Sequence, residues 1–203
     1  MELLSSTGTS LTPTIDGYQF PEITGAGDLG ELDDANWLIV AGRVKAADRE
    51  WKFRDPCLLT GEARWISEWF RAVAEGTMPP TPIAEPDYEN QDMLNFLEPN
   101  LGFSYESRVD EEVLIRAHLS LEALPTDLDE EVDLHEYSVD LVLTRARVAA
   151  AVEVWDEERR AYPARGWSPR RTPPTFPRPA AADRLSALRG KQRPRPGWGH
   201  GAH

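Results

Sequence analysis

The chain contains a single cysteine, Cys57, and has no long hydrophobic run. One cysteine excludes an intramolecular disulfide, which fits a reducing compartment. The first 17 residues lack the basic and apolar regions of a secretory signal. No apolar run approaches the roughly 20 residues that a membrane-spanning helix requires. These absences predict a soluble cytoplasmic protein with no membrane partner.

Motifs of common catalytic and cofactor sites are also missing. The sequence has no glycine-rich phosphate loop and no GxSxG, and its glycine-rich stretch at 24–34 is not followed by a helical pattern. Outside the last four residues the only histidines are His118 and His135, and these with one cysteine do not make a zinc site. We therefore expect no metal, no cofactor and no enzymatic activity.

Cys57 is the remaining candidate nucleophile. It lies three residues before Thr60, the expected N-cap of a helix, where a thiol pKa can be depressed. A nucleophilic thiol also needs a base, and nothing in the sequence places His118 or His135 beside it. The apolar neighbours Leu58 and Leu59 favour a buried, unreactive thiol over a thiol-dependent enzyme.

Charge divides the chain into two regions. Residues 163–203 hold nine of the 22 basic residues and one of the 35 acidic residues, so this segment carries +8 and residues 1–162 carry −21. An acidic body of this kind repels phosphates, which argues against binding of nucleic acid. It suits a basic protein partner, although a merely well-solvated surface is the simpler interpretation.

Composition divides the chain at the same place. Residues 163–203 include eight of the 17 prolines and have no sustained apolar periodicity. Such a segment cannot offset its ordering entropy by burial. We therefore expect one acidic domain at 1–162 and a disordered, basic, Pro/Arg-rich tail at 163–203.

Hydrophobic patterning within the body favours strands. Residues 35–46 are typical of a central strand, and residues 50–55 follow a short turn as the second arm of a hairpin. Residues 93–99 and 100–107 form a second expected pair. Residues 113–121 alternate, with Val113 to Leu121 on one face, as in a half-buried antiparallel strand. Residues 137–143 alternate again.

Two segments show helical patterns. Residues 61–75 have a wide apolar face, with Thr60 as the expected cap and Gly76 as the end. A final helix begins after Thr144 and has four residues on its buried stripe: Val148, Ala151, Val152 and Trp155. The sequence therefore predicts an α+β domain, mostly antiparallel, with two helices packed on the sheet.

Two irregular segments separate these elements. Residues 77–90 carry four prolines, and a loop of this length is often functional. Residues 126–136 form an acidic loop with five closely spaced carboxylates: Asp127, Asp129, Glu130, Glu131 and Asp133. The loop lacks the central glycine and the twelfth-position glutamate of an EF-hand, so a solvated loop is favoured over a calcium site.

Three stretches together resemble the WapI-type immunity proteins, bacterial protectors against cell-wall-associated polymorphic toxins. They are DANWLIVAGRV at 34–44, WKFRDPCLLTGEARWISEWF at 51–70 and FLEPNLGFSYE at 96–106. The later stretches RAHLSLEALP and VAAAVEVWDEERRAYP fit the same pattern. The resemblance covers residues 14–163. It implies that the segment from Asp55 to Thr60 marks the family's transition from a strand to a helix and is not an active site.

This resemblance implies a function by binding. Family members neutralise a toxin domain, often a nuclease, and such toxins tend to be basic, so an acidic inhibitor associates fast. The expected contacts are the exposed, irregular, acidic segments: Asp127, Asp129, Glu130, Glu131 and Asp133 in the acidic loop, and Asp87 and Tyr88 in the proline-rich loop. The alternative is an acidic regulatory or scaffold module without a toxin partner.

Overall fold

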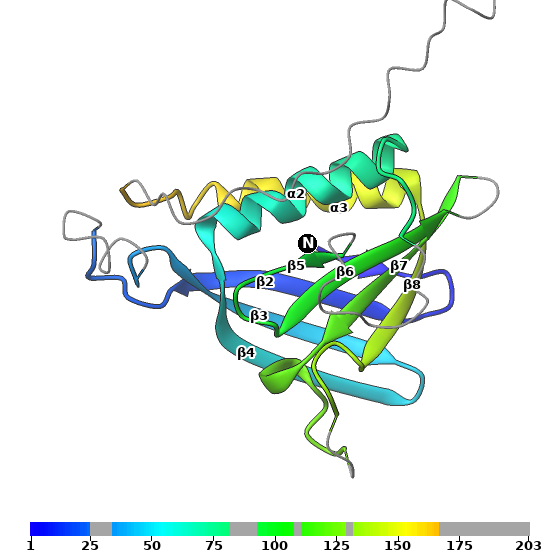
Figure 1. Cartoon of the computed structure of the whole chain (residues 1–203), viewed down its shortest axis with the longest axis horizontal. Helices are drawn as coiled ribbons and strands as arrows, with labels where there is room; N and C mark the ends of the chain where they lie inside the picture. The colour runs from blue at the N-terminus through cyan, green and yellow to red at the C-terminus, as the bar shows by residue number, and fades with distance from the viewer. Residues whose placement is uncertain (25–33, 82–92, 108–110, 129–131, 167–203) are drawn as a thin grey trace, which may run out of the picture.

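The computed structural model describes residues 1–24, 34–81, 93–107, 111–128 and 132–166, and shows two antiparallel four-stranded sheets with two helices (Figure 1). One sheet consists of β1 (Leu3–Leu4), β2 (Ser10–Tyr18), β3 (Trp37–Ala46) and β4 (Arg49–Leu59), in that order. The other consists of β5 (Leu94–Asn95), β6 (Leu101–Ser107), β7 (Glu112–Leu119) and β8 (Ser138–Thr144). The α+β fold class is confirmed, with the strands divided between two sheets.

Strand β3 is central, as expected, because it pairs with β2 on one side and with β4 on the other. Its alternate residues Leu38, Val40 and Val44 are fully buried, so one face of this sheet forms part of the core. The β3–β4 hairpin closes through Ala47 and Asp48, between the paired residues Ala46 and Arg49. Ala47 takes the positive φ that a tight two-residue turn requires.

Strand β7 differs from the expected half-buried strand because both of its faces are largely covered. Val113 and Ile115 face the core, yet Leu114 and His118 on the opposite face are only 3% exposed. The expected alternation also ends before Leu121, which is 47% exposed and has a φ of 53°. Leu121 starts the 3-10 turn η1 (Leu121–Ala123) and has left the strand.

Helix α2 (Thr60–Glu75) follows β4 directly and matches the expected helix closely. Its N-cap is Leu59 and not Thr60. The hydroxyl of Thr60 instead donates to Asn36 Oδ1 at 2.8 Å, and the Leu59 N–H donates to Glu62 at 2.9 Å, which satisfies one of the free amides at a helix start. Gly76 ends the helix in the left-handed conformation.

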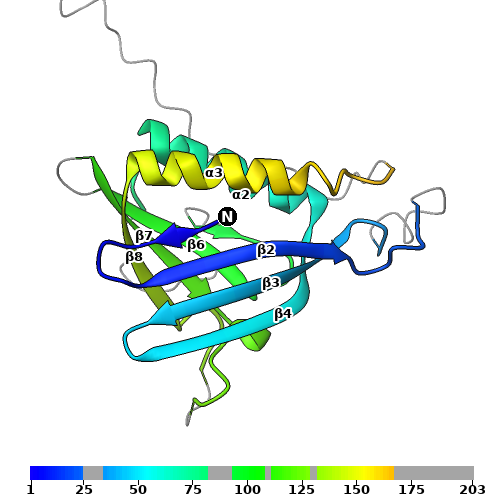
Figure 2. The same ribbon diagram turned by 180° about the vertical axis from the view of Figure 1, so that it is seen from behind.

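Helix α3 (Arg145–Arg159) follows β8, and Thr144 is its N-cap as expected, accepting from the Arg147 N–H at 3.3 Å. The two helices run side by side in opposite directions and lie on one side of the sheets (Figures 1 and 2). Trp155 joins them, because its buried Nε1 donates to the Ala63 carbonyl at 2.8 Å. Among the described residues, no helix is long and apolar enough to cross a membrane.

The core lies between the helices and the inner faces of both sheets. Its aromatic centre consists of Trp69 and Phe70 from α2 and Phe103 and Tyr105 from β6, all at most 1% exposed. Phe70 and Phe103 meet edge to face at 5.0 Å between ring centroids, a favourable aromatic geometry. The expected apolar face of α2 is therefore core.

Strands β1 and β8 bring the two sheets together. The Ser6 N–H donates to the Val142 carbonyl at 3.1 Å, and the Val142 N–H donates to Ser5 Oγ at 3.0 Å. These two contacts close one end of a seam between the sheets.

Candidate partner-binding surfaces

The structure describes two of the seven residues expected at a partner contact. Asp127 is exposed and forms an ion pair of 3.5 Å with Arg49 at the start of β4. Asp133 is also exposed, in the turn before β8. The other five lie outside the described residues: Asp87, Tyr88, Asp129, Glu130 and Glu131.

A buried polar network holds the end of the acidic loop against the outer face of the second sheet. The His135 N–H donates to Ser120 Oγ at 2.6 Å, and His118 Nδ1 lies 3.0 Å from the His135 carbonyl oxygen. Since a carbonyl only accepts, Nδ1 carries the proton, and the neutral ring accepts from Ser104 Oγ at Nε2, 2.8 Å away. The loop is therefore anchored after its acidic run.

The anchoring histidines prefer their neutral forms. Burial lowers the pKa of His118, and Arg116 adds to this effect against the opposing His135 hydrogen bond. Burial and the nearby His118 ring likewise lower the pKa of His135. Both groups therefore favour a neutral network near pH 7.

A second acidic group, which the sequence analysis missed, lies beside this anchor. Burial raises the pKa of Asp55 on β4, and the nearby carboxylates of Glu122 and Glu98 raise it further. Within the described residues, no lysine or arginine forms an ion pair with any of the three. We call Asp55, Glu98 and Glu122 the carboxylate patch.

Two neighbouring turns carry most of this patch and also expose apolar side chains. The Ser120 N–H donates to the Asn100 carbonyl at 3.1 Å, and Asn100 Nδ2 donates to Glu122 at 2.9 Å, so the turns are in contact. Leu97 in the first turn is 49% exposed and Leu121 in the second is 47% exposed. Exposed leucines beside unpaired charges are typical of surfaces that bind other proteins.

Buried contacts fix both turns in place. Glu62, only 1% exposed, accepts from the Leu97 N–H at 2.8 Å and so ties the first turn to the start of α2. The Trp51 indole donates to the Ala123 carbonyl at 2.9 Å and ties the second turn to β4. A preordered surface of this kind loses little conformational entropy when a partner binds.

The carboxylate patch and the acidic loop occupy the same end of the molecule. Ser120 contacts His135 of the loop on one side and, on the other, Asn100, which donates to Glu122 of the patch. The segment after β7 lies on the side of the sheets away from the two helices in both views (Figures 1 and 2), whereas the turn at Leu97 contacts the start of α2. The signal in the sequence was weak, because Asp55, Glu98 and Glu122 come from three separate segments with unremarkable spacing.

Cys57 is buried in the core cluster, close to the carboxylate patch. Burial, followed by the charges of Asp55 and Glu62, raises the pKa of its thiol well above the usual range. A thiol in this environment is unreactive as a nucleophile. Among the described residues, no group of three or more histidine, cysteine, aspartate or glutamate side chains is arranged to hold a metal ion.

The chain was compared with known protein families, curated proteins and solved structures. The model of the immunity protein WapI-like family matches residues 2–163. No curated protein and no solved structure matched the chain. Since the match spans most of the 203 residues and agrees with the expectation from the sequence, the chain belongs to the WapI-like immunity protein family.

Proposed function

We propose that this chain is a non-catalytic immunity protein that binds a toxin domain and neutralises it by protein–protein contact. Membership of the WapI-like family is the observation that carries the proposal. The net charge of −21 on residues 1–162 supports a basic partner. A nuclease toxin, which must hold a polyanion, would present such a basic surface.

The acidic end of the molecule is the proposed contact surface. It combines the carboxylate patch with the acidic loop, including Asp127 and Asp133, and with the exposed side chains of Leu97 and Leu121. Charges would accelerate the encounter, and the leucines would be buried in the complex. The remaining expected contacts stay part of this proposal: Asp87, Tyr88, Asp129, Glu130 and Glu131.

Cytoplasmic location and a polymorphic toxin system complete the proposal. In such a system the toxin is the C-terminal domain of a large secreted protein, and its producer keeps the inhibitor inside the cell. The gene for this chain should then lie beside a gene for a long, repeat-rich protein. That neighbour supplies the partner for a binding test.

The test measures binding between the full chain and the purified C-terminal domain of the neighbour by calorimetry at two salt concentrations. Tight binding that weakens with salt is expected, because screening reduces the attraction between exposed charges. Co-expression of the chain should also restore growth of cells that produce the toxin domain. Absence of binding and of rescue would overturn the proposal and favour an acidic scaffold module.

A further inference from the structure

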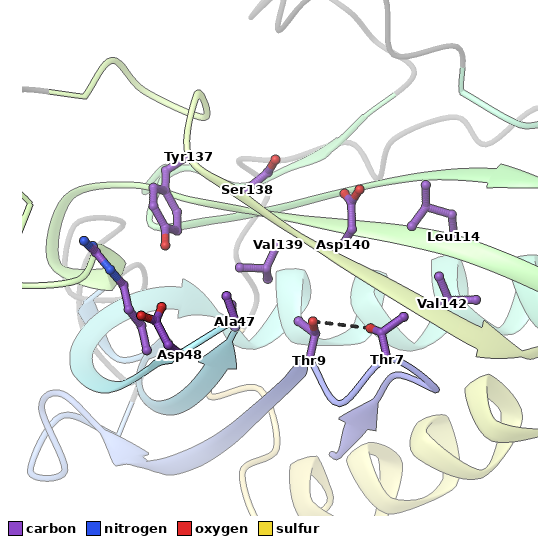
Figure 3. Close-up of a pocket in the computed structure, with 12 residues that line it drawn as sticks. Thr7, Thr9, Ala47, Asp48, Leu114, Tyr137, Ser138, Val139, Asp140 and Val142 are labelled. Atoms are coloured by element: carbon purple, nitrogen blue, oxygen red, sulfur yellow. Dashed lines mark hydrogen bonds between the residues drawn. The ribbon is translucent and has the colours of Figure 1, made fainter.

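The seam between the two sheets opens into a hollow. It is closed where Ser6 contacts Val142, and it widens along β8 toward Ser138 into a volume of about 720 Å³. The strand β8 forms one wall (Figure 3). The loop after β1, with Thr7 and Thr9, and the hairpin turn at Ala47–Asp48 lie opposite.

The backbone of β8 offers unused hydrogen-bonding groups to this hollow. The Leu119 N–H donates to the Tyr137 carbonyl, and this register places Val139 and Leu141 in the ladder with β7. The intervening residues Ser138 and Asp140 therefore direct their N–H and C=O groups away from β7. Within the described residues, these groups have no hydrogen-bond partner.

The position of Val142 confirms this direction. Val142 lies two residues after Asp140, so its main-chain groups point to the same side of β8 as those of Ser138 and Asp140. Its N–H and C=O groups form hydrogen bonds across the seam with Ser5 and Ser6. The free edge is thus the continuation of an edge that is already paired at one end. An open sheet edge beside a hollow is the geometry used when an extended peptide adds as a further strand.

Charge indicates what kind of strand fits. Asp140 on β8 is 53% exposed but already forms an ion pair of 2.7 Å with Arg116 of β7. Arg49 lines the hollow and pairs with Asp127, whereas Asp48 at the hairpin turn forms no ion pair within the described residues. A lysine or arginine of an added strand would therefore find its free carboxylate at Asp48 and would share that of Asp140 with Arg116. Contact between the acidic bodies of two copies is disfavoured, because two bodies of charge −21 repel each other.

We propose that the edge of β8 at Ser138 and Asp140 accepts an extended, positively charged segment of a partner protein as an added strand. The identification of that partner as the toxin rests on the function proposed above, whereas the strand-accepting edge does not. Main-chain hydrogen bonds would supply affinity, and the carboxylate of Asp48 would select basic side chains.

The experiment selects binders from a random dodecapeptide library on the immobilised full chain, with counter-selection against the variant Ser138→Pro. Proline at 138 removes an outward N–H and is tolerated at the first residue of a strand. Ser138→Ala is the matched control, since it keeps the N–H. Asp48→Lys is a second variant that keeps the edge and reverses a charge beside it, and thermal unfolding confirms that each variant is folded.

The expected peptides are basic and free of proline at their centre. Their affinity should fall by about tenfold in Ser138→Pro, as for the loss of one buried hydrogen bond, and by less than about twofold in Ser138→Ala. Asp48→Lys should also weaken their binding. Hydrogen exchange at the amides of Ser138 and Asp140 should slow when a peptide binds.

Several results would overturn the proposal. One is a failure to enrich peptides, and another is equal peptide affinity for wild type and Ser138→Pro. A third is slow hydrogen exchange at the amides of Ser138 and Asp140 in the isolated chain, which would mean that the chain covers its own edge. A wild-type dimer that Ser138→Pro converts to a monomer would assign the edge to a second copy. A toxin domain that binds without slowing exchange at these amides would leave the proposed function intact and remove the toxin as the occupant.

Discussion

His118 and His135 are linked by a hydrogen bond from the His118 Nδ1–H to the His135 carbonyl oxygen, with 3.0 Å between the two atoms. The bond joins the outer face of β7 to the end of the acidic loop. His135 holds a φ of 63°, unusual for a residue with a side chain. Buried contacts from His118 and Ser120 therefore hold the main chain at the end of the loop.

Lowering the pH should destabilise the protein through these histidines. Burial lowers both folded-state pKa values, so the unfolded chain binds more protons below its own histidine pKa of about 6.5. The free energy of unfolding is then highest above about pH 6.5. It decreases as the pH falls below the unfolded-state histidine pKa and toward the lower pKa values of the folded state. Urea titrations between pH 7.5 and 5 measure this slope.

The variant His135→Asn provides the control, because asparagine tolerates a positive φ and does not titrate. Its unfolding free energy should depend less on pH over the same interval. An equal slope in wild type and variant would show that His135 does not contribute to the pH dependence.

Neutralising the carboxylate patch should slow binding of the toxin domain. The double variant Glu98→Gln/Glu122→Gln is expected to reduce the association rate at low salt by about threefold or more, because steering depends on charge near the contact. The same variant should be slightly more stable, by up to about 0.5 kcal/mol, since repulsion with Asp55 is relieved. Stopped-flow kinetics and urea unfolding give the two values.

A matched pair of substitutions tests whether position matters. Glu75→Gln/Glu153→Gln removes the same charge from exposed residues of α2 and α3, away from the acidic end. It should change the association rate by less than about twofold if steering is local. Equal effects of the two double variants would indicate that only the net charge matters.

Cys57 should react with iodoacetamide only after the protein is unfolded. The side chain is fully buried, and its raised pKa keeps the thiolate population small near pH 7. Mass spectrometry after timed labelling, with and without urea, provides the measurement. Rapid labelling of the folded protein would instead indicate that Cys57 is an accessible, reactive nucleophile.

Replacement of Trp155 by phenylalanine should weaken the contact between the helices. The variant loses the buried hydrogen bond from the indole to Ala63 and part of the ring that packs between the helices, at a cost of about 1–3 kcal/mol. Val154→Ala is the neighbouring control, because Val154 is 56% exposed, and it should change stability by less than about 0.5 kcal/mol. Similar losses in both variants would contradict the role of the bond.

Two glycine substitutions should have opposite effects. A Cβ atom at Gly42 of β3 would overlap the ring of Phe53 on β4, so Gly42→Ala should destabilise the sheet by about 1–3 kcal/mol. At Gly61 in α2 the added Cβ meets nothing within 4 Å, and alanine should stabilise the helix by about 0.5–1 kcal/mol. Thermal unfolding of both variants measures the contrast, and a loss of stability at Gly61 would contradict it.

The sequence alone was sufficient for most elements and for the family. Helix α2, the cap at Thr144 and the strands β3, β4 and β8 were predicted, because periodicity of apolar residues and cap chemistry are local properties. The three quoted stretches also identified the WapI-like family, which the family comparison confirmed. The acidic character of the body was visible from composition.

Tertiary structure decided the rest. It divided the strands into two sheets, covered both faces of β7 and turned Leu121 out to solvent. It also assembled Asp55, Glu98 and Glu122 without a neighbouring cation in the described residues. A sequence records each charge and each apolar side chain, but long-range strand pairing determines which of them meet and which edge, such as Ser138 and Asp140, stays open.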